Sequence, residues 1–356
     1  MFCIAPEILW VKNKCLIIST ACFISMTIVT FSHRALSGSE WEGVETWETG
    51  DTSCHCEPTP LAGWNASTNA PKSLCGPSAD LRGPGQRVLS FSLYGKEVGD
   101  NSDLRMKEYT EGIRGNVEDL RAHYPKGYTA RVYHDKNWEE NPGQMEDLCN
   151  VYCAHRDIMD LCPVRKLALK RPPGLEQLPL LPRFGMLWRF SPIADPLVTE
   201  FHSRDLDSRP TGREWAAVEE WLRSDRTYHV MRDHPNHKVA MLGGLWGMRF
   251  DRMQNDNGRR EIVHIFEKML CRGAKWFRGL DQDLLKEHLW PVAKKDMVAH
   301  DSWHCKWFES PMNQPWPVRR KMEGRNFVGS VTEKHRLTAE CPAECRPRKH
   351  PEWTLC

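Results

Sequence analysis

Strand-like and helix-like segments alternate along the middle of the chain, and this alternation limits the fold more than any other feature. Short runs rich in β-branched and aromatic residues predict strands, and segments with apolar residues three or four positions apart predict helices. The predicted strands are residues 87–95, 128–135, 197–205 and 227–233. The predicted helices are residues 106–125, 143–154 and 212–225. This order predicts a Rossmann-like α/β/α sandwich with a mostly parallel central sheet.

The N-terminal region contains an uncharged apolar segment. Residues 15–31 carry no charge, Lys12 and Lys14 precede them, and acidic residues follow from Glu40. An apolar run of about 17 to 25 residues is able to span a bilayer, and basic residues favour the cytoplasmic side. We therefore expect a cytoplasmic tail at residues 1–14, a transmembrane signal anchor at residues 15–31 and a lumenal remainder. The alternative is a cleaved signal peptide, which would give a secreted form.

The segment after the anchor has the composition of a stalk. Residues 32–86 are acidic at first and then rich in Pro, Gly, Ser and Thr, without a sustained apolar period. Such a composition predicts little regular structure. The segment also contains a glycosylation sequon, Asn65-Ala66-Ser67, which functions only in a lumenal protein.

Cysteine usage also indicates a secretory protein. Three of the 14 cysteines lie in or before the apolar segment, and the other 11 form clusters typical of disulfides. The last cluster belongs to a basic, Pro-rich tail at residues 332–356, which we expect to be held by disulfides over the domain. The net charge of only +2 argues against a nucleic-acid partner.

One motif combines carboxylates and guanidinium groups. The string Arg204-Asp205-Leu206-Asp207-Ser208-Arg209 follows a predicted strand and precedes a predicted helix. In open α/β sheets ligands bind beyond the carboxyl ends of the strands. Two aspartates in such a loop suit Mg²⁺ or Mn²⁺, and arginines beside them suit phosphate oxygens. The alternative is a set of surface ion pairs, since a second Asp-x-Asp occurs at residues 281–283.

A second group of polar residues follows the predicted strand 227–233. Asp233, His234 and His237 leave this strand at the same edge of the sheet, and the pair Gly243-Gly244 lets backbone approach a ligand closely. Trp246 offers a stacking face for a sugar or a base. The alternative is a tight loop in which Trp246 belongs to the core.

A third group lies near the end of the predicted domain. His300, Asp301 and His304 are spaced so that two of them are able to share one cation, and on a helix the histidines would share a face. The alternative is that each histidine is a hydrogen-bonded structural residue.

Together these features resemble a known class of enzymes. The strings SLYG, NVEDLRAHYPKGYTARVYHD, RDLDSRPTGREWAAVEEWL, MRDHPNHKVAMLGGLWG and GLDQDLL are similar to a little-characterised family of glycosyltransferase-like proteins. The short anchor, the stalk and the Asp-x-Asp loop resemble a Golgi type II glycosyltransferase with a GT-A-like fold. The similarity covers residues 87–331, which would form the catalytic domain.

The resemblance implies roles for individual residues. Asp205 and Asp207 match the aspartates that hold a divalent metal, Mn²⁺ or Mg²⁺, on the diphosphate of a nucleotide-sugar donor, and either His300 or His304 would complete the metal shell. Tyr94 and Gly95 lie where the first strand meets the nucleotide, and Arg204 and Arg209 would stabilise the departing phosphate. If the reaction inverts the anomeric centre, a carboxylate must act as base, and the candidates are Asp233 and Asp283. The remaining donor-binding candidates are Gly243, Gly244 and Trp246.

The resemblance predicts a metal-dependent glycosyltransferase acting on a glycan or protein acceptor in the Golgi lumen. Two alternatives remain at the level of the sequence. One is a zinc-dependent hydrolase in which His234, His237, His300 and His304 supply the ligands. The other is a carbohydrate- or protein-binding ectodomain that has the fold but no activity, since a fold does not imply a function.

Overall fold

The chain divides into two units, and Glu42–Cys356 is the second of them. A computed structural model describes residues 52–56, 70–95, 102–170, 176–181, 183–253, 256–273, 277–308, 312–324 and 326–356, all within the second unit. The predicted anchor at residues 15–31 and the sequon lie outside the described residues. Within these ranges, none of the helices combines the length and the apolar character needed to cross a bilayer.

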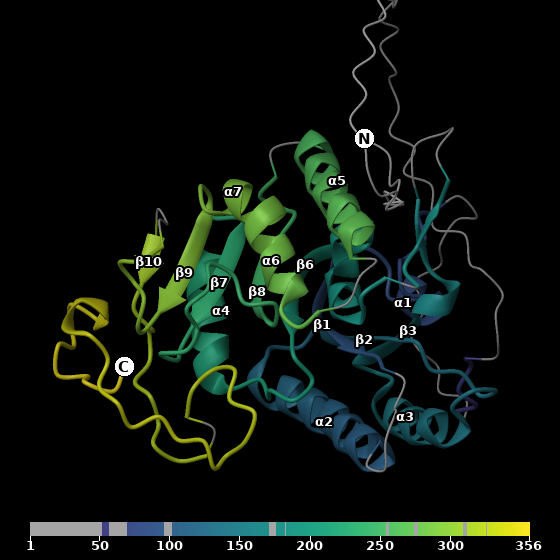
Figure 1. Cartoon of the computed structure of the whole chain (residues 1–356), viewed down its shortest axis with the longest axis horizontal. Helices are drawn as coiled ribbons and strands as arrows, with labels where there is room; N and C mark the ends of the chain where they lie inside the picture. The colour runs from purple at the N-terminus through teal and green to yellow at the C-terminus, as the bar shows by residue number, and fades with distance from the viewer. Residues whose placement is uncertain are drawn as a thin grey trace, which may run out of the picture. The chain divides into compact units, whose positions relative to one another are not determined.

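An eight-stranded sheet forms the centre of the second unit (Figure 1). The strand order is β10-β9-β7-β8-β6-β1-β2-β3, and β8 alone among these strands runs antiparallel to its neighbours. The strands are β1 (Gln86–Leu93), β2 (Tyr128–His134), β3 (Met159–Pro163), β6 (Val198–Arg204), β7 (Tyr228–Arg232), β8 (Leu245–Arg249), β9 (Met297–Asp301) and β10 (Met312–Gln314). The prediction of an α/β fold with a mostly parallel sheet is therefore confirmed.

Helical elements and short strands connect the sheet. The helices are α1 (Pro77–Asp80), α2 (Ser102–His123), α3 (Pro142–His155), α4 (Gly212–Arg223), α5 (Asp256–Arg272), α6 (Leu280–Leu284) and α7 (Trp290–Ala293). The 3₁₀ helices are η1 (Val164–Lys166), η2 (Gly185–Ala194) and η4 (Ala343–Cys345), and η3 (Leu285–Leu289) is a π-helix. Strand β4 (Ala168–Leu169) pairs with β5 (Leu178–Pro179) in a separate small sheet.

Helices cover both faces of the sheet (Figure 1). Leu89 and Phe91 of β1 point to the face covered by α2, α3 and α4, and Val88 points to the face covered by η2, α5 and α6. Successive side chains of a strand face opposite sides. The side of β1 toward α2 is apolar, with Leu89, Phe91 and Leu93, whereas the other side carries Val88 followed by Ser90 and Ser92. The second half of the strand therefore alternates between apolar and small polar residues, although both faces are covered.

Helix α4 illustrates how local sequence sets the element boundaries. Thr211 caps its first turn, because the Thr211 hydroxyl accepts a hydrogen bond from the Glu214 amide at 3.1 Å. Val218 and Trp221 lie on one face of the helix and are fully buried. The predicted helix at residues 212–225 therefore agrees with the structure to within two residues at its end.

Part of the predicted stalk belongs to the folded unit, which corrects the expectation of an unstructured segment there. Disulfides join Cys54 to Cys149 and Cys56 to Cys153 of α3. Farther along, Leu74 is fully buried and Cys75 is bonded to Cys162. A Pro- and Gly-rich composition correctly indicates little helix or strand in this segment. It does not show that disulfides to a distant helix hold the segment in place.

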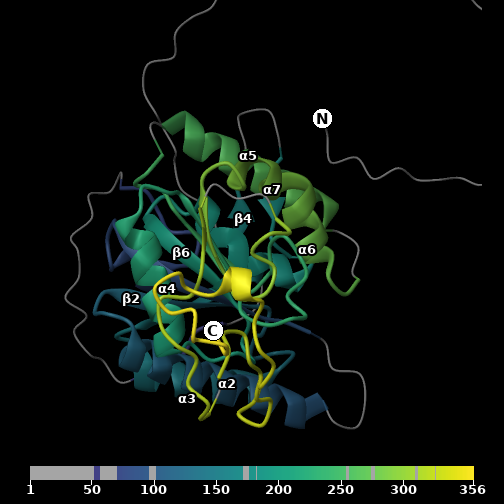
Figure 2. The same ribbon diagram turned by 90° about the vertical axis from the view of Figure 1, so that its left-hand side faces the viewer.

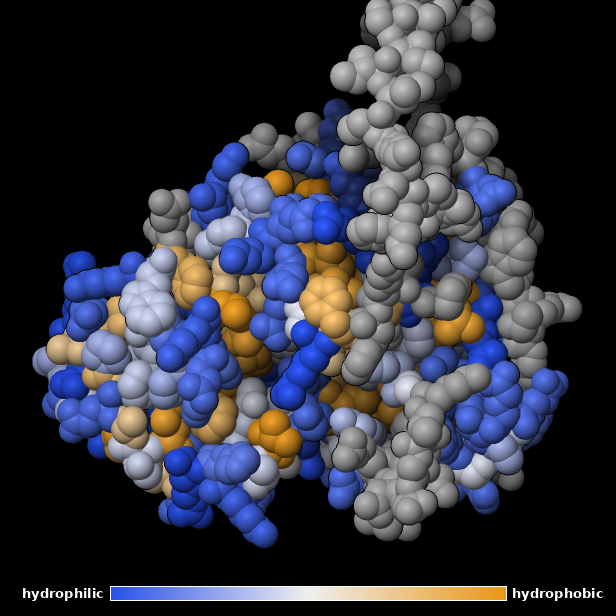
Figure 3. Space-filling view, viewed as in Figure 1, coloured by the Kyte–Doolittle hydropathy of each residue, from blue (hydrophilic) through white to orange (hydrophobic). Residues whose placement is uncertain are grey.

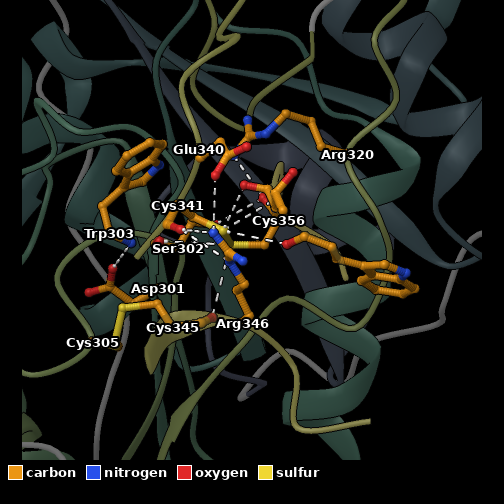
Figure 4. Close-up of a disulfide and its surroundings, with 12 residues drawn as sticks. Asp301, Ser302, Trp303, Cys305, Arg320, Glu340, Cys341, Cys345, Arg346 and Cys356 are labelled. Carbon is orange, nitrogen blue, oxygen red and sulfur yellow. Dashed lines mark hydrogen bonds and ion pairs between the residues drawn. A yellow bond between two sulfur atoms is a disulfide. The ribbon is translucent and has the colours of Figure 1, made fainter. Parts of the chain in front are cut away.

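The C-terminal tail packs against the β10 end of the sheet (Figures 1 and 2). Disulfides join Cys305 to Cys345 and Cys341 to Cys356. Figure 4 shows the second bond together with Arg320, which donates to the Cys356 oxygen at 2.9 Å. The expectation of a disulfide-pinned tail is therefore confirmed.

Candidate functional site

A hollow of about 390 Å³ lies beyond the carboxyl end of β6. The charged side chains that line it are Arg189, Asp205, Asp207, Arg278 and Asp281. A smaller hollow of about 160 Å³ shares Arg189, Asp205 and Asp207 and extends to Ser92 and Tyr94 at the end of β1. The Asp-x-Asp loop therefore lies where ligands bind in open α/β sheets, at the carboxyl ends of adjacent parallel strands.

Arg189 is the centre of the charge arrangement in this hollow. It lies on η2, its side chain is only 5% exposed, and its guanidinium donates to Asp205 and, at 2.7 Å, to Asp281. Its backbone amide donates to the Ser92 hydroxyl at 2.9 Å. The residue thereby joins the ends of β1 and β6 to helix α6.

Gly243 and Gly244 hold the backbone against these carboxylates. A Cβ atom added at Gly243 would lie 1.9 Å from Asp281 Oδ2, and one added at Gly244 would lie 2.2 Å from Asp205 Oδ2. No residue larger than glycine fits at either position without moving a carboxylate. The glycine pair was predicted to let the backbone approach a ligand closely. In the described residues, the backbone instead lies close to the side chains of Asp205 and Asp281.

The three carboxyl groups are electrostatically different. Burial raises the pKa of the Asp205 carboxyl, but the Arg189 guanidinium lowers it more, so that the net shift is downward. Burial and the neighbouring Asp205 carboxylate raise the pKa of Asp207. Burial also raises the pKa of Asp281, and Arg189 only partly opposes this effect. Asp207 and Asp281 are thus carboxylates whose negative charge is incompletely balanced by the protein.

The aromatic end of the site contains Tyr94. Its ring packs so closely against Gly185 that an added Cβ would lie 2.2 Å from the ring. Burial raises the pKa of the Tyr94 hydroxyl, which therefore stays protonated. Gly95, the next residue, has a φ of +122° and accepts a hydrogen bond from Lys136 Nζ at 2.7 Å through its carbonyl. Tyr94 lines the smaller hollow, whereas Gly95 lies beyond the end of β1 and is not part of that lining.

The two arginines of the motif have other partners. Arg204 is fully buried and forms an ion pair with Glu214 of α4 at 3.0 Å. Arg209 forms an ion pair with Asp119 of α2 at 2.7 Å and lines a separate hollow of about 210 Å³. Neither lines the Asp205 hollow, so the structure corrects their expected position beside the donor phosphate. They fix the loop to two helices instead.

Three further predicted site residues also lie elsewhere. Trp246 is fully buried on β8 between Phe190 and Phe201, so it offers no stacking face. Asp233 is fully buried and pairs with Arg213 at 2.9 Å and with Arg320 at 2.7 Å. Asp283 is exposed and does not line the hollow. Of the two predicted bases, one is therefore sequestered by arginines and the other is outside the site.

The histidines of the third group do not reach the aspartates. His300 is fully buried in β9 and lies 2.8 Å from the His229 ring nitrogen and 3.0 Å from Glu220. His304 lies 3.0 Å from the carbonyl oxygen of Pro235. Among the described residues, no three His, Cys, Asp or Glu side chains are grouped so that they alone would hold a metal ion. The histidine set required for a zinc hydrolase is thus not assembled.

The oxygen donors around the hollow nevertheless fit a hard divalent cation. Asp205 and Asp207 line the same space, and Asp281 Oδ1 is buried without a hydrogen-bond partner in the described part of the chain. Mg²⁺ is commonly held by one or two carboxylates together with water and substrate phosphate oxygens. Carboxylate oxygens suit Mn²⁺ equally. Asp205 and Asp207 are the residues that would hold such an ion, with phosphate and water completing its shell.

Sequence reasoning did not select three lining residues, Arg189, Arg278 and Asp281. A signal for Arg189 was present, because it interrupts the apolar run Met186 to Phe190, and a buried arginine needs a partner. Asp281 belongs to the second Asp-x-Asp. Its first aspartate lines the hollow, whereas its second, Asp283, is the one predicted as a base.

Comparisons with known proteins give only distant likenesses. No protein-family model and no curated protein sequence matches the chain. Among solved structures, it is similar to a glycosyltransferase involved in the glycosylation of the major capsid of PBCV-1, with 15% identity and a TM-score of 0.34 over 61% of this chain and 82% of that chain. The glycosyltransferase GlyE of Streptococcus pneumoniae TIGR4 gives 13% identity and a TM-score of 0.33 over 60% of this chain and 45% of that chain.

A third similar structure is the mannosyltransferase PcManGT from Pyrobaculum calidifontis, in complex with GDP-Man and Mn²⁺. It gives 10% identity and a TM-score of 0.30 over 62% of this chain and 74% of that chain. Similarities of this size assign no residue of the site, which is therefore defined by its own geometry.

Proposed function

We propose that the chain is a metal-dependent glycosyltransferase that moves a sugar from a nucleotide-sugar donor to a glycan or protein acceptor. The observation that supports this most is the charge of the hollow. Three aspartates and two arginines line it, and His237, also in its lining, is kept neutral because burial lowers its pKa to about 4. One negative charge is therefore in excess among the described lining residues.

This excess charge bears directly on substrate binding. A diphosphate is itself an anion, and like charges about 4 Å apart repel by several kcal/mol near a protein surface. A divalent cation between the aspartates and the diphosphate would reverse the sign of that interaction. When bound, such a cation would act as a Lewis acid that stabilises the charge on the departing diphosphate. Metal-dependent binding of a nucleoside diphosphate is therefore the expected property of the site.

The geometry also supports one carboxylate as the base. Arg189 holds Asp281 Oδ2, whereas Asp281 Oδ1 has no hydrogen-bond partner in the described residues. In the proposed step, the acceptor hydroxyl oxygen forms a bond to the anomeric carbon as the bond from that carbon to the diphosphate oxygen breaks, and Asp281 takes the hydroxyl proton. Its raised pKa makes it a stronger base than an ordinary aspartate. Asp281 thus replaces Asp233 and Asp283 as the candidate for this role.

Disulfide content supports a place in the secretory pathway. Five disulfides join pairs of described residues, and disulfides persist in oxidising compartments. With the apolar segment at residues 15–31, this is the basis for proposing a Golgi membrane protein of type II, whose lumenal domain meets nucleotide-sugar donors and glycan or glycoprotein acceptors.

The test is a thermal-shift titration of the full-length chain with a panel of nucleoside diphosphates and nucleotide sugars, each with and without Mn²⁺. A ligand that binds only the folded state raises its stability. We expect the melting temperature to rise with nucleotides that carry one particular nucleobase, and only when Mn²⁺ is present. We expect Asp207→Asn to weaken the binding of that nucleotide by about tenfold or more. The matched control is Asp225→Asn, since the Asp225 side chain is 82% exposed and precedes β7 at the opposite edge of the sheet.

Two results would contradict the proposal. If the melting temperature rose equally without Mn²⁺, and if Asp207→Asn left this rise unchanged, nucleotide binding would not depend on a metal at Asp207. Glycan binding with no dependence on nucleotide or metal would favour the non-catalytic ectodomain.

A further inference from the structure

Arg189 occupies the place of a cation between two carboxylates. Its guanidinium donates to Asp205 and to Asp281 Oδ2, and its backbone is held to β1 through the Ser92 hydroxyl. Its Nη1 also lies 3.4 Å from the Arg204 carbonyl oxygen. Of these four contacts, those with Ser92 and Asp281 lie outside the Asp-x-Asp motif, so Arg189 would keep two anchors if its bond to Asp205 were lost.

The backbone keeps the two carboxylates close to this guanidinium. Gly243 and Gly244 lie so near to Asp281 and Asp205 that neither side chain has room to withdraw toward β8. Two carboxylates held in this way would repel each other if no cation lay between them. Arg189 supplies that cation, and its planar fork is suited to bonding both carboxylates at once.

The same arrangement limits how a metal reaches the site. Asp205 is a proposed metal ligand, and its Oδ1 is already bonded to Arg189, whereas Asp207 is exposed and forms no such bond to Arg189 in the structure. The other oxygen, Asp205 Oδ2, packs against Gly244, so a divalent ion that binds both aspartates competes with the guanidinium for Oδ1. Asp281 is the partner that would keep the displaced guanidinium in the site.

We propose that Arg189 is an internal cation that balances the acidic site when no metal is present and competes with the divalent ion for Asp205. Arg189 is thus a positioning residue that sets the metal affinity of the site and makes the fold independent of metal. This inference rests on the proposed function, because it takes Asp205 and Asp207 as the metal ligands.

The test measures Mn²⁺ binding to the full-length chain by the loss of the free-ion electron paramagnetic resonance signal, with no nucleotide present. A hydrogen bond to a charged group contributes about 1.5 to 3 kcal/mol, so removing the competitor with Arg189→Met is expected to tighten Mn²⁺ binding by about tenfold or more. Without metal, the melting temperature of this variant should fall, and saturating Mn²⁺ should raise it by more than in the wild type.

Two further variants separate competition from a general charge effect. Arg209→Met also removes a positive charge near Asp207, but Arg209 is bonded to Asp119 outside the hollow, so its Mn²⁺ affinity should stay within about twofold of the wild type. Adding Asp205→Asn to Arg189→Met should abolish the gain in affinity, because it removes the carboxylate for which the two cations compete.

Arg189→Lys keeps the test decisive if Arg189→Met does not fold. A lysine retains the charge but not the two-pronged donor, so we expect Mn²⁺ binding about threefold tighter than in the wild type. An Mn²⁺ affinity equal to that of the wild type in whichever of the two variants folds would overturn the inference. Failure of the proposed function is a separate result, because it would show as absent nucleoside diphosphate binding by the wild type even when Arg189→Met binds Mn²⁺ more tightly.

Discussion

At the scale of single residues, Gly244 controls the position of Asp205. A Cβ at this position would lie 2.2, 2.4 and 2.7 Å from the three carboxyl atoms of Asp205, well inside contact distance. Gly244→Ala must therefore displace the Asp205 carboxylate from its present position. Overpacking of this kind costs about 1 to 3 kcal/mol of the free energy of unfolding. We also expect Mn²⁺-dependent nucleoside diphosphate binding to weaken by about tenfold or more, as measured by titration calorimetry.

Gly258→Ala is the matched control for Gly244→Ala. The nearest atom to a Cβ at Gly258 lies 3.6 Å away, an ordinary contact, and Gly258 lies in helix α5. Alanine is favoured over glycine in a helix by up to about 1 kcal/mol, so stability should be equal or higher and ligand binding unchanged. Normal ligand binding by a folded Gly244→Ala protein would show that Asp205 has no part in the site.

Some of the residues at this site are predictable from the sequence, and others are not. Asp205, Asp207 and the glycine pair were found because motif and strand end coincide, and the structure brings them together. Trp246 was misplaced because it lies on a strand that pairs with β6 and β7, and side-chain direction depends on that pairing. Asp281 lines the hollow and Asp283 does not, because residues two positions apart on one helix point in different directions, and the Asp-x-Asp pattern alone does not show which of them faces the site.

At the scale of elements, two neighbouring disulfides join residues 52–56 to α3. Cys54–Cys149 and Cys56–Cys153 close almost the same loop, with sequence separations of 95 and 97. A disulfide stabilises mainly by restricting the unfolded chain, so the second bond adds little while the first remains. We expect Cys54→Ser with Cys149→Ser to cost about 1 kcal/mol of the free energy of unfolding. Removal of both bonds should cost about 3 to 4 kcal/mol, because Cys75–Cys162 still closes a loop over the same part of the chain.

Urea unfolding of these variants gives the measurement. Cys305–Cys345 is the comparison, because no other bond between described residues closes the same 40-residue separation, and its removal alone should cost about 4 kcal/mol. Equal and additive losses for the two neighbouring disulfides would show that they do not constrain one common loop.

Local sequence patterns predict some of the helices and strands but not others. Strands β1, β2, β6 and β7 and helices α2, α3 and α4 were predicted near their observed bounds, because each has its own apolar period. The ten residues of η2 and the antiparallel strand β8 were not predicted as such. Their conformations depend on packing against α5 and on pairing between β6 and β7, which are contacts between distant parts of the chain.

At the scale of the whole molecule, the fold holds several histidines in their neutral form. Burial lowers the pKa of His134 to about 3 and that of His237 to about 4, and it also lowers the pKa values of His229 and His300. In the unfolded chain a histidine has a pKa of about 6.5. Below that pH the unfolded state therefore binds protons that the folded state does not, and stability must fall as the pH falls.

The expected loss follows from this proton linkage. Between pH about 7 and about 5.5, His134 and His237 each remove about 1 kcal/mol of the free energy of unfolding, and the lowered pKa values of His229 and His300 act in the same direction. The raised pKa values of Asp207 and Asp281 act in the opposite direction, because the folded state takes up those protons first, but carboxyl groups titrate mainly at lower pH. Histidines therefore dominate this window, and urea unfolding at the two pH values measures their sum.

His134→Gln identifies one contribution to that sum. His134 is fully buried on β2, away from the hollow, so the variant removes one titrating group without touching the site. The free energy of unfolding of this variant at pH about 7 is compared with its own value at pH about 5.5, which cancels the packing cost of the substitution. The difference between the two pH values should be smaller than in the wild type by about 1 kcal/mol. An unchanged difference would mean that His134 is protonated in the folded protein, in conflict with its burial.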